Sequence, residues 1–359
     1  KQSVLYYSHE TSYSRTTGIW QTVWLEYVPQ AYIKSVKYYP DAQNSKLIIR
    51  ALVEGEGTFT AKAYYQGKEV GCDTAISNGE NADLVIKLSE KHLWEVGNGR
   101  LYDLKLQFED DIVDSYFGLR STYVDGYRYM LNGKSVFQRT VLDQGYYKEG
   151  IYTAPSEEDM INDIKISQDM GFNGARLHQK VFESRFLYHC DKMGYLVWGE
   201  YASWGVDHSD YKSLPVFLKE WEEVLERDFN HPAIIGWCPL NETWDIEGRK
   251  QRDEIIRSVY ETTKMIDDTR PCIDTSGHFH VITDIYDVHD YEQDPAVFKK
   301  TYDDFAKDKT LDYSLEKNPA TKGRQPYNDE PFFVSEYGGM RWDAENTGTG
   351  WGYGNAPKT

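Results

Sequence analysis

The stretch Ile234-Ile-Gly-Trp-Cys-Pro-Leu240, followed directly by Asn241-Glu242, indicates the fold of the C-terminal part of the chain. A short apolar run of this kind is typical of a strand buried on both faces in a parallel sheet. Phe332-Phe-Val-Ser-Glu336 has the same composition and also ends in a glutamate. Because strands of a (β/α) barrel end at one face, where these folds place their active sites, the sequence predicts that Glu242 and Glu336 share one site.

On both sides of this stretch, from Gly118 onward, short apolar strands alternate with segments of helical periodicity, which predicts βα units. Helices are expected near 157–170, 183–193, 216–229 and 252–266, the first capped by Ser156. Strands are expected near Val136–Asp143, Gly174–His178, Leu196–Tyr201, Ile234–Leu240, Cys272–Ser276, Ile285–Tyr291 and Phe332–Glu336. We therefore predict a (β/α)8 TIM barrel over residues 120–359 that is truncated before strand 8, because seven strands are found and Gly348 to Thr359 has the character of a loop.

The region before the barrel has a different rhythm, with period-two alternation between about Tyr32 and Leu119. Strands are expected at 46–53, 58–65, 83–88 and 103–108, with turns at Glu54–Gly57, Gln66–Gly67 and Asn78–Gly79. This spacing predicts an immunoglobulin-like β-sandwich over residues 30–119. Residues 1–29 contain an apolar, aromatic segment, Thr17 to Glu26, which predicts one or two strands at the tail of a further β domain.

Composition excludes several classes of partner. The 40 basic and 58 acidic residues give a net charge of −18, which repels nucleic acids and anionic membrane surfaces. No apolar run is long enough to span a membrane. The first ten residues lack the apolar run of a signal peptide, but Lys1 opens inside a predicted domain, so cytoplasmic, periplasmic and secreted locations all stay open.

The cysteines and histidines give little support to a metal or redox site. Cys72, Cys190, Cys238 and Cys272 are widely spaced, and we predict buried free thiols. His278-Phe-His280 follows a predicted strand and could serve a metal-dependent hydrolase, but two histidines are an incomplete ligand set. No catalytic metal or other cofactor is predicted, and a structural cation is left open.

One longer segment resembles a known family. Arg227-Asp-Phe-Asn-His-Pro-Ala-Ile-Ile-Gly-Trp-Cys-Pro-Leu-Asn-Glu242 is similar to the acid/base signature of glycoside hydrolase family 2, which includes β-galactosidases, β-glucuronidases and β-mannosidases. Further similar segments occur in family order: Thr17–Trp24, Tyr116–Arg120 with Leu131–Lys134, Gly171–His178 and Cys190–Glu200.

The resemblance implies a retaining mechanism in which Glu242 is the general acid/base and Glu336 the nucleophile, with Asn241 holding the sugar hydroxyl beside the reacting carbon. It also implies that residues 1–29 are the remnant of an N-terminal jelly-roll sugar-binding domain. Two carboxyl groups in these roles are what retaining glycosidic cleavage requires.

Other polar residues at predicted strand ends are expected to bind sugar hydroxyls: Asp143, Arg176, His178, Glu200, His289 and Tyr291. For Arg176 the alternative is a buried side chain that fixes a neighbouring carboxylate, and for the two histidines it is a core position. The segment Arg176-Leu-His178 is one residue shorter than in many relatives. The family's eighth-strand aromatic is missing, and Trp342 or Trp351 could replace it, whereas Trp198 and Trp237 are expected in the core.

The predicted function is that of a retaining exo-β-glycosidase acting on an oligosaccharide or other glycoside. We favour a β-galactosidase, because no basic cluster follows a predicted barrel strand to hold a glucuronate carboxylate. β-Mannosidase, β-glucuronidase and arabinosidase remain alternatives, as does a non-catalytic carbohydrate-binding protein. Homo-oligomer formation is left open.

Overall fold

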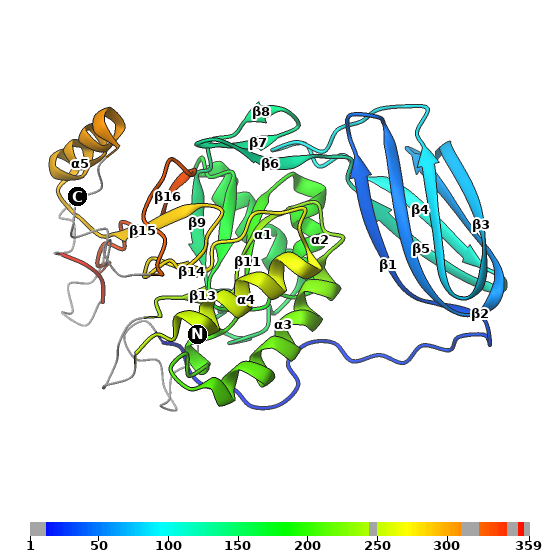
Figure 1. Cartoon of the computed structure of the whole chain (residues 1–359), viewed down its shortest axis with the longest axis horizontal. Helices are drawn as coiled ribbons and strands as arrows, with labels where there is room; N and C mark the ends of the chain where they lie inside the picture. Colours follow the sequence, from blue (N-terminus) through cyan, green and yellow to red (C-terminus); the bar gives the residue numbers. More distant parts are fainter. Residues whose placement is uncertain (1–11, 244–249, 310–322, 343–350, 355–359) are drawn as a thin grey trace.

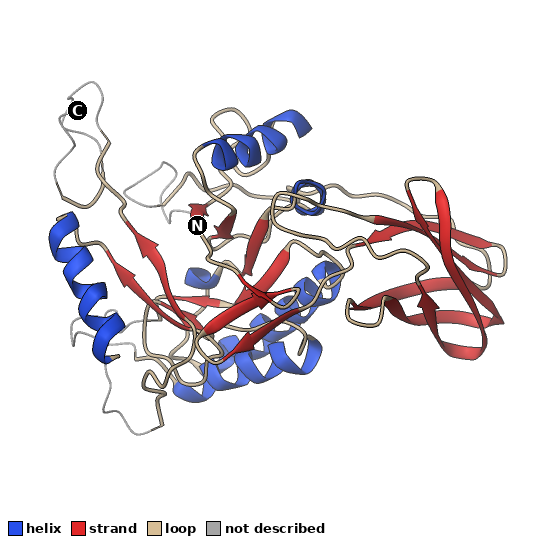
Figure 2. Ribbon diagram, turned by 90° about the horizontal axis from the view of Figure 1, so that it is seen from above, coloured by secondary structure: helices blue, strands red, loops and turns tan. Residues whose placement is uncertain are grey.

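The computed structural model describes residues 12–243, 250–309, 323–342 and 351–354. An all-β part lies at one end of the molecule and a part with helices and parallel strands occupies the remainder (Figure 1). Figure 2 shows the same division from above, with the helices confined to the second part. No helix among the described residues is long and apolar enough to cross a membrane.

The all-β part is an antiparallel sheet in which β2 pairs with β1, β3 and β4, and β4 pairs with β5. Alternate side chains of these strands build a separate buried core that includes Leu47, Phe59 and Leu106. The immunoglobulin-like topology and the domain limits remain predictions. The strands are β1 (Tyr32–Asp41), β2 (Lys46–Tyr65), β3 (Lys68–Lys87), β4 (Tyr102–Phe108) and β5 (Asp111–Phe117).

Two of the predicted turns in this region are wrong. Glu54–Gly57 lies inside β2 and Asn78–Gly79 inside β3, where the ladder shifts register between Leu52 and Gly55 and then continues. The glycines allow an irregularity in two long strands, because Gly55 and Gly79 have φ of 89° and 117°. Gln66–Gly67 is the turn of the β2–β3 hairpin, as predicted.

The strand prediction for Thr17 to Glu26 is also wrong. Within the described residues this segment has no strand partner, and Leu25 and Tyr27 are 86% and 98% exposed. Side-chain contacts hold it against the second part instead: Gln21 donates to the carbonyl of Val181, and the ring of Trp20 lies 5.1 Å from the Lys180 ammonium.

The second part begins with a small antiparallel sheet of β6 (Thr122–Asp125), β7 (Arg128–Leu131) and β8 (Lys134–Ser135). The parallel strands follow at all seven predicted positions, the fourth of which contains two short strands, β12 and β13. The described residues contain no ladder between the first strand, β9, and the last, β16. Their bounds are β9 (Thr140–Asp143), β10 (Gly174–Leu177), β11 (Leu196–Glu200), β12 (Ile234–Cys238), β13 (Leu240–Asn241), β14 (Thr275–Ser276), β15 (Tyr286–Asp290) and β16 (Phe332–Tyr337).

The four predicted helices are present, as α1 (Glu157–Asp169), α2 (Ser184–Met193), α3 (Leu214–Asp228) and α4 (Asp253–Ile266). The Ser156 hydroxyl caps α1 by accepting from the N–H of Asp159. A fifth helix, α5 (Pro295–Asp308), was not predicted, although Asp294 caps it and proline occupies its first position.

The core of the second part contains Trp198 and Trp237, both fully buried, as predicted. Cys190, Cys238 and Cys272 are buried free thiols, but Cys72 is exposed. The burial prediction for Cys72 is wrong because its neighbours in β3 alternate between the two faces, and Cys72 lies on the solvent face.

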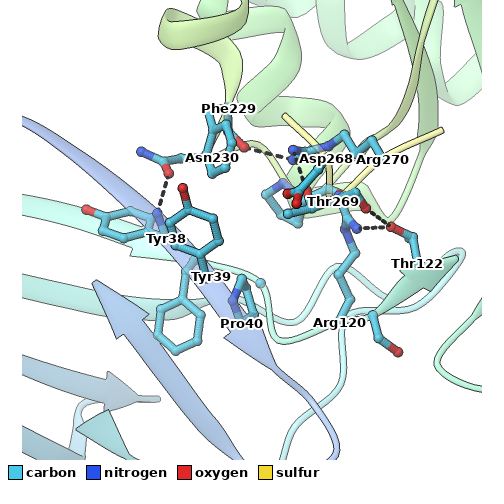
Figure 3. A pocket seen from close by; sticks show the side chains of 14 residues that line it. Tyr38, Tyr39, Pro40, Arg120, Thr122, Phe229, Asn230, Asp268, Thr269 and Arg270 are labelled. Atoms are coloured by element: carbon cyan, nitrogen blue, oxygen red, sulfur yellow. Dashed lines mark hydrogen bonds between the residues drawn. The ribbon is translucent and has the colours of Figure 1, made fainter. Parts of the chain in front are cut away.

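A pocket of about 270 Å³ lies where the all-β part meets the second part, between Tyr38 and Tyr39 of β1 and Arg120 and Arg270 (Figure 3). Both arginines donate to backbone carbonyls there, Arg120 to Pro232 and Ile234, and Arg270 to Ile234 and Phe229. These bonds lie at the start of β12, and β1 is joined to the second part by the N–H of Tyr38, which donates to Oδ1 of Asn230 at 2.8 Å.

Candidate active site

The parallel ladders bring the two predicted carboxylates together. Asn241 pairs with Ser276 in the β13–β14 ladder, and Glu242 follows it with its N–H bonded to the Ser276 carbonyl at 2.9 Å. In the next ladder, β15–β16, His289 pairs with Glu336. The site is therefore assembled by the ends of β13 to β16, as the strand pattern indicated.

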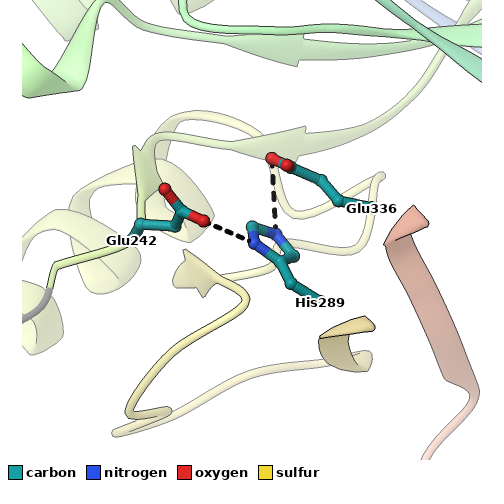
Figure 4. Close-up of side chains that lie close together, drawn as sticks. All are labelled: Glu242, His289 and Glu336. Atoms are coloured by element: carbon teal, nitrogen blue, oxygen red, sulfur yellow. Dashed lines mark hydrogen bonds and ion pairs between the residues drawn. The ribbon is translucent and has the colours of Figure 1, made fainter. Parts of the chain in front are cut away.

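His289 lies between the two glutamates (Figure 4). Its Nδ1 is 2.8 Å from Oε1 of Glu242, and its Nε2 is 3.5 Å from Oε1 of Glu336. A carboxylate oxygen of each glutamate and a ring nitrogen of His289 all lie within 4.8 Å of one another. Retaining glycosidases need their two carboxyl groups about 5–5.5 Å apart, whereas inverting enzymes need about 6.5–9.5 Å.

Glu336 is held by several donors. Arg176 Nη1 donates to its Oε1 at 2.8 Å, His178 Nε2 lies 3.4 Å from the same oxygen, and the Tyr291 hydroxyl donates to Oε2. Burial raises the pKa of Glu336, but the hydrogen bond from His178 and the charges of His289 and Arg176 outweigh it and hold the pKa well below its usual range. Glu336 is consequently ionised at neutral pH, the state that a nucleophile requires.

Arg176 is buried and contacts protein side chains. This position matches the alternative prediction, a buried arginine that fixes a neighbouring carboxylate. Its side chain is 1% exposed and forms an ion pair with Glu200 in addition to the bond to Glu336. It also donates from Nη2 to Oδ1 of Asn241 at 2.5 Å. Burial raises the pKa of Glu200 to about 7, although Arg176 and the N–H of Gln179 act in the opposite direction. Glu200 is therefore a buried partner that holds the Arg176 guanidinium in place.

Asn241 combines a fixed oxygen with an unused donor. The residue is 2% exposed, its N–H bonds the Ser203 hydroxyl at 3.0 Å and its carbonyl accepts from Trp204 Nε1. The Nδ2 amide group has no partner among the described residues. A buried donor of this kind is available to a ligand hydroxyl.

Asp143 is not brought to the carboxylate pair by a hydrogen bond among the described residues. Its Oδ1 accepts from the N–H of Gly145 at 2.8 Å, and burial raises the pKa of its carboxyl to about 6. Of the two predicted replacement aromatics, Trp342 is 73% exposed, and Trp351 is 48% exposed and packs edge-on against Tyr353 with ring centroids 5.3 Å apart. Tyr353, which the sequence reasoning missed, stacks on Tyr291 with ring centroids 3.8 Å apart.

The histidine pair considered for a metal does not form an open ligand set. His280 is buried with Nδ1 bonded to Asp274 and Nε2 bonded to the carbonyl of Asp287. Both ring nitrogens are thus engaged by protein groups. Glu242, His289 and Glu336 are themselves close enough to contact one ion, but the charged Arg176 guanidinium shares Glu336 with them, which opposes a cation there.

Comparison with known proteins agrees with this architecture. The family profile "Glycosyl hydrolases family 2, TIM barrel domain" matches residues 124–350. The chain belongs to glycosyl hydrolase family 2. This match covers the βα units and both glutamates.

Among curated relatives of this family 2 chain, a β-galactosidase of Leuconostoc mesenteroides is 27% identical over 64% of the chain and 25% of its own length. A β-glucuronidase of Streptococcus agalactiae is 28% identical over 46% of the chain and 31% of its own length. The chain thus spans a quarter to a third of these relatives.

Solved structures share the fold. A β-glucuronidase of Ruminococcus gnavus superposes with a TM-score of 0.72 over 88% of this chain and 55% of its own, at 17% identity. One from Dictyoglomus thermophilum gives 0.71 over 90% of this chain and 57% of its own, at 20% identity.

Proposed function

We propose that the family 2 chain carries the catalytic centre of a retaining exo-β-glycosidase, with Glu336 as the nucleophile and Glu242 as the general acid/base. The observation that supports this most is the approach of the two carboxylates to within 4.8 Å, with His289 between them. So close an approach of two carboxylate oxygens favours the separation of about 5–5.5 Å between the carboxyl groups of retaining enzymes over the about 6.5–9.5 Å of inverting enzymes.

In the first step, an oxygen of Glu336 attacks the anomeric carbon while Glu242 gives its proton to the glycosidic oxygen. The carbon–oxygen bond to the leaving group breaks and a glycosyl ester of Glu336 forms. Arg176, His178 and Tyr291 keep Glu336 ionised and fix its orientation before attack.

In the second step, Glu242, now ionised, takes a proton from water as the water oxygen attacks the same carbon. The ester bond breaks, Glu336 leaves as a carboxylate and Glu242 is protonated again, so the cycle closes with retained configuration. The free Nδ2 of Asn241 is the donor that we assign to the hydroxyl next to the reacting carbon.

For the sugar, a terminal β-galactoside is our first proposal and a β-glucuronide the second. Relatives of both names match the chain. A glucuronide carboxylate would favour a basic partner, but Arg176 and Lys180, the basic residues near the ends of β9 and β10, already bond protein oxygens. At these two strand ends, within the described residues, this favours the neutral sugar.

A panel of nitrophenyl glycosides tests both points on the purified protein. Release of nitrophenol from the β-galactoside, with the glucuronide, mannoside and arabinoside turned over more slowly, supports the proposal. Binding of galactose without any turnover would favour the carbohydrate-binding alternative. We also propose that the reaction needs no metal, so a chelator should leave the rate unchanged, and abolished activity would favour the metal-dependent hydrolase.

A further inference from the structure

A buried polar network lies directly behind His289. It contains Asp274, His280 and Asp287, none more than 2% exposed, together with the fully buried hydroxyl residue Ser276. Asp274 directly precedes β14, Ser276 lies on β14, His280 lies in the loop after it, and Asp287 lies on β15. None of these residues takes part in the two proposed steps, but Ser276 contacts His289, which in turn contacts both Glu242 and Glu336.

His280 lies between two carboxylates. Its Nδ1 is 2.7 Å from Asp274 Oδ1, and its Nε2, which is bonded to the Asp287 carbonyl at 2.9 Å, also lies 3.2 Å from Asp287 Oδ1. Burial lowers the pKa of His280, but the charge and hydrogen bond of Asp274 and those of Asp287 raise it well above its usual value. Burial likewise raises the pKa of Asp287, and the His280 contact outweighs this and lowers it. The imidazolium therefore stabilises an ionised Asp287 inside the protein.

Asp287 in turn fixes the direction of the nearby hydroxyl groups. Its Oδ2 accepts from Ser276 Oγ at 2.7 Å, from the N–H of Gly277 at 3.0 Å, and from Ser335 Oγ. A serine has one hydroxyl proton, and both Ser276 and Ser335, which lies 3.1 Å from it, direct theirs to Asp287. Ser276 can therefore only accept from its third neighbour. That neighbour is Nε2 of His289, at 3.0 Å.

The backbone holds the His289 ring in this position. Gly277 has φ of 69°, and a Cβ there would lie 2.3 Å from atoms of the His289 ring, so only glycine allows the approach. With Nε2 bearing a proton towards Ser276, the ring presents Nδ1 to Glu242 Oε1 at 2.8 Å. One further proton then lies between these two atoms, whichever of them carries it.

We propose that the Asp274–His280–Asp287–Ser276 network keeps a proton on Nε2 of His289, so that His289 Nδ1 and Glu242 share the proton which Glu242 delivers to the glycosidic oxygen. The proposal rests on the function proposed above. Ser276, Asp287 and His280 are positioning residues in it, because they act through His289 and touch no substrate.

Several other charged or titratable groups face His289 and act on the same proton. Glu336 on β16 lies 3.5 Å from Nε2, and its charge is balanced by Arg176 and His178 on the β10 side. Tyr291, two residues after His289, donates a hydrogen bond from its hydroxyl to Glu336. These groups stay in place when Ser276 is changed, so a Ser276 variant isolates the network.

The test is Ser276→Ala, compared with Tyr260→Phe as a matched control. Tyr260 on α4 also donates a hydroxyl to a carboxylate, that of Asp284, whose other oxygen accepts from the N–H of Cys272. Without the Ser276 acceptor the protonated ring is less favoured, so we expect the alkaline limb of kcat/KM to move to lower pH by about half to one unit. At pH values above that limb, kcat/KM for alkyl glycosides should fall by about three- to tenfold more than kcat/KM for nitrophenyl glycosides, whose leaving group needs little protonation.

Tyr260→Phe should leave both the pH profile and the leaving-group dependence unchanged. An unshifted profile in Ser276→Ala, or an equal shift in Tyr260→Phe, overturns the proposal. Nitrogen-15 NMR of labelled histidine in the unsubstituted protein, with His289→Asn for assignment, tests it without any variant having to work. Protonated Nε2 is expected, and a neutral ring protonated on Nδ1 refutes the proposal. If no glycoside is cleaved, the proposed function fails, and the NMR result still decides the protonation state of His289.

Discussion

Replacing Arg176 by methionine should destabilise the protein strongly, because the arginine is the buried counter-ion of Glu200. Both side chains are 1% exposed, and the same guanidinium also bonds Glu336 and Asn241. Removing one member of a buried ion pair leaves the other unpaired, which costs about 3–5 kcal/mol. At neutral pH we therefore expect Arg176→Met to lower the free energy of unfolding by that amount.

The double variant Arg176→Met/Glu200→Met separates the ion pair from simple packing. It removes the uncompensated carboxylate together with the arginine, so most of the lost stability should return, leaving a deficit of about 1–2 kcal/mol for the bonds to Glu336 and Asn241. Urea unfolding, followed by tryptophan fluorescence, measures the free energy of unfolding of the unsubstituted protein, the single variant and the double variant. A double variant that is no more stable than Arg176→Met would refute the counter-ion reasoning.

Four further outcomes follow from the site. Glu336→Gln should lower kcat for every glycoside by about 10⁴-fold or more, and retained turnover would reject it as nucleophile. Glu242→Gln should slow alkyl glycosides by about 10²–10⁴-fold and largely spare nitrophenyl glycosides, so equal losses would contradict its role. The carboxyl of Asp143 has a pKa of about 6 in the folded protein, above its unfolded value, so the free energy of unfolding should fall as the pH rises from about 4 to about 6. Urea titrations at both pH values should show no such fall for Asp143→Asn. Gly277→Ala should displace the His289 ring and reduce kcat with both substrate types, and unchanged kcat would show that the ring can move.

The sequence predicted the parallel strands and both glutamates because each signal is local. An apolar strand that ends in an acid can be recognised from a few neighbouring residues, and parallel ladders bring such ends together. The role of Arg176 was open because one side chain at a strand end can face either the mouth or the interior. Its three partners come from three different strands, and sequence spacing does not show which of them it contacts.

Other features depended on interactions between distant residues. The turn expected at Glu54–Gly57 is a bulge because β3 runs beside β2 along its whole length, which a short window of sequence does not reveal. The network behind His289 joins Ser276 to Asp287 across two strands. Neither residue has sequence neighbours that would indicate this contact. For α5 the signal was present, since Asp294 followed by Pro295 is a usual helix start.

Glu242 has a backbone φ of 44°, a left-handed conformation that suits glycine or asparagine better than glutamate. A random library selected for heat resistance alone would consequently enrich asparagine or glycine at this position, since either relieves the local strain. Such variants would be more stable to heat but catalytically inactive. Anyone evolving this protein for hotter reactors should therefore screen each round for product formation as well as for survival.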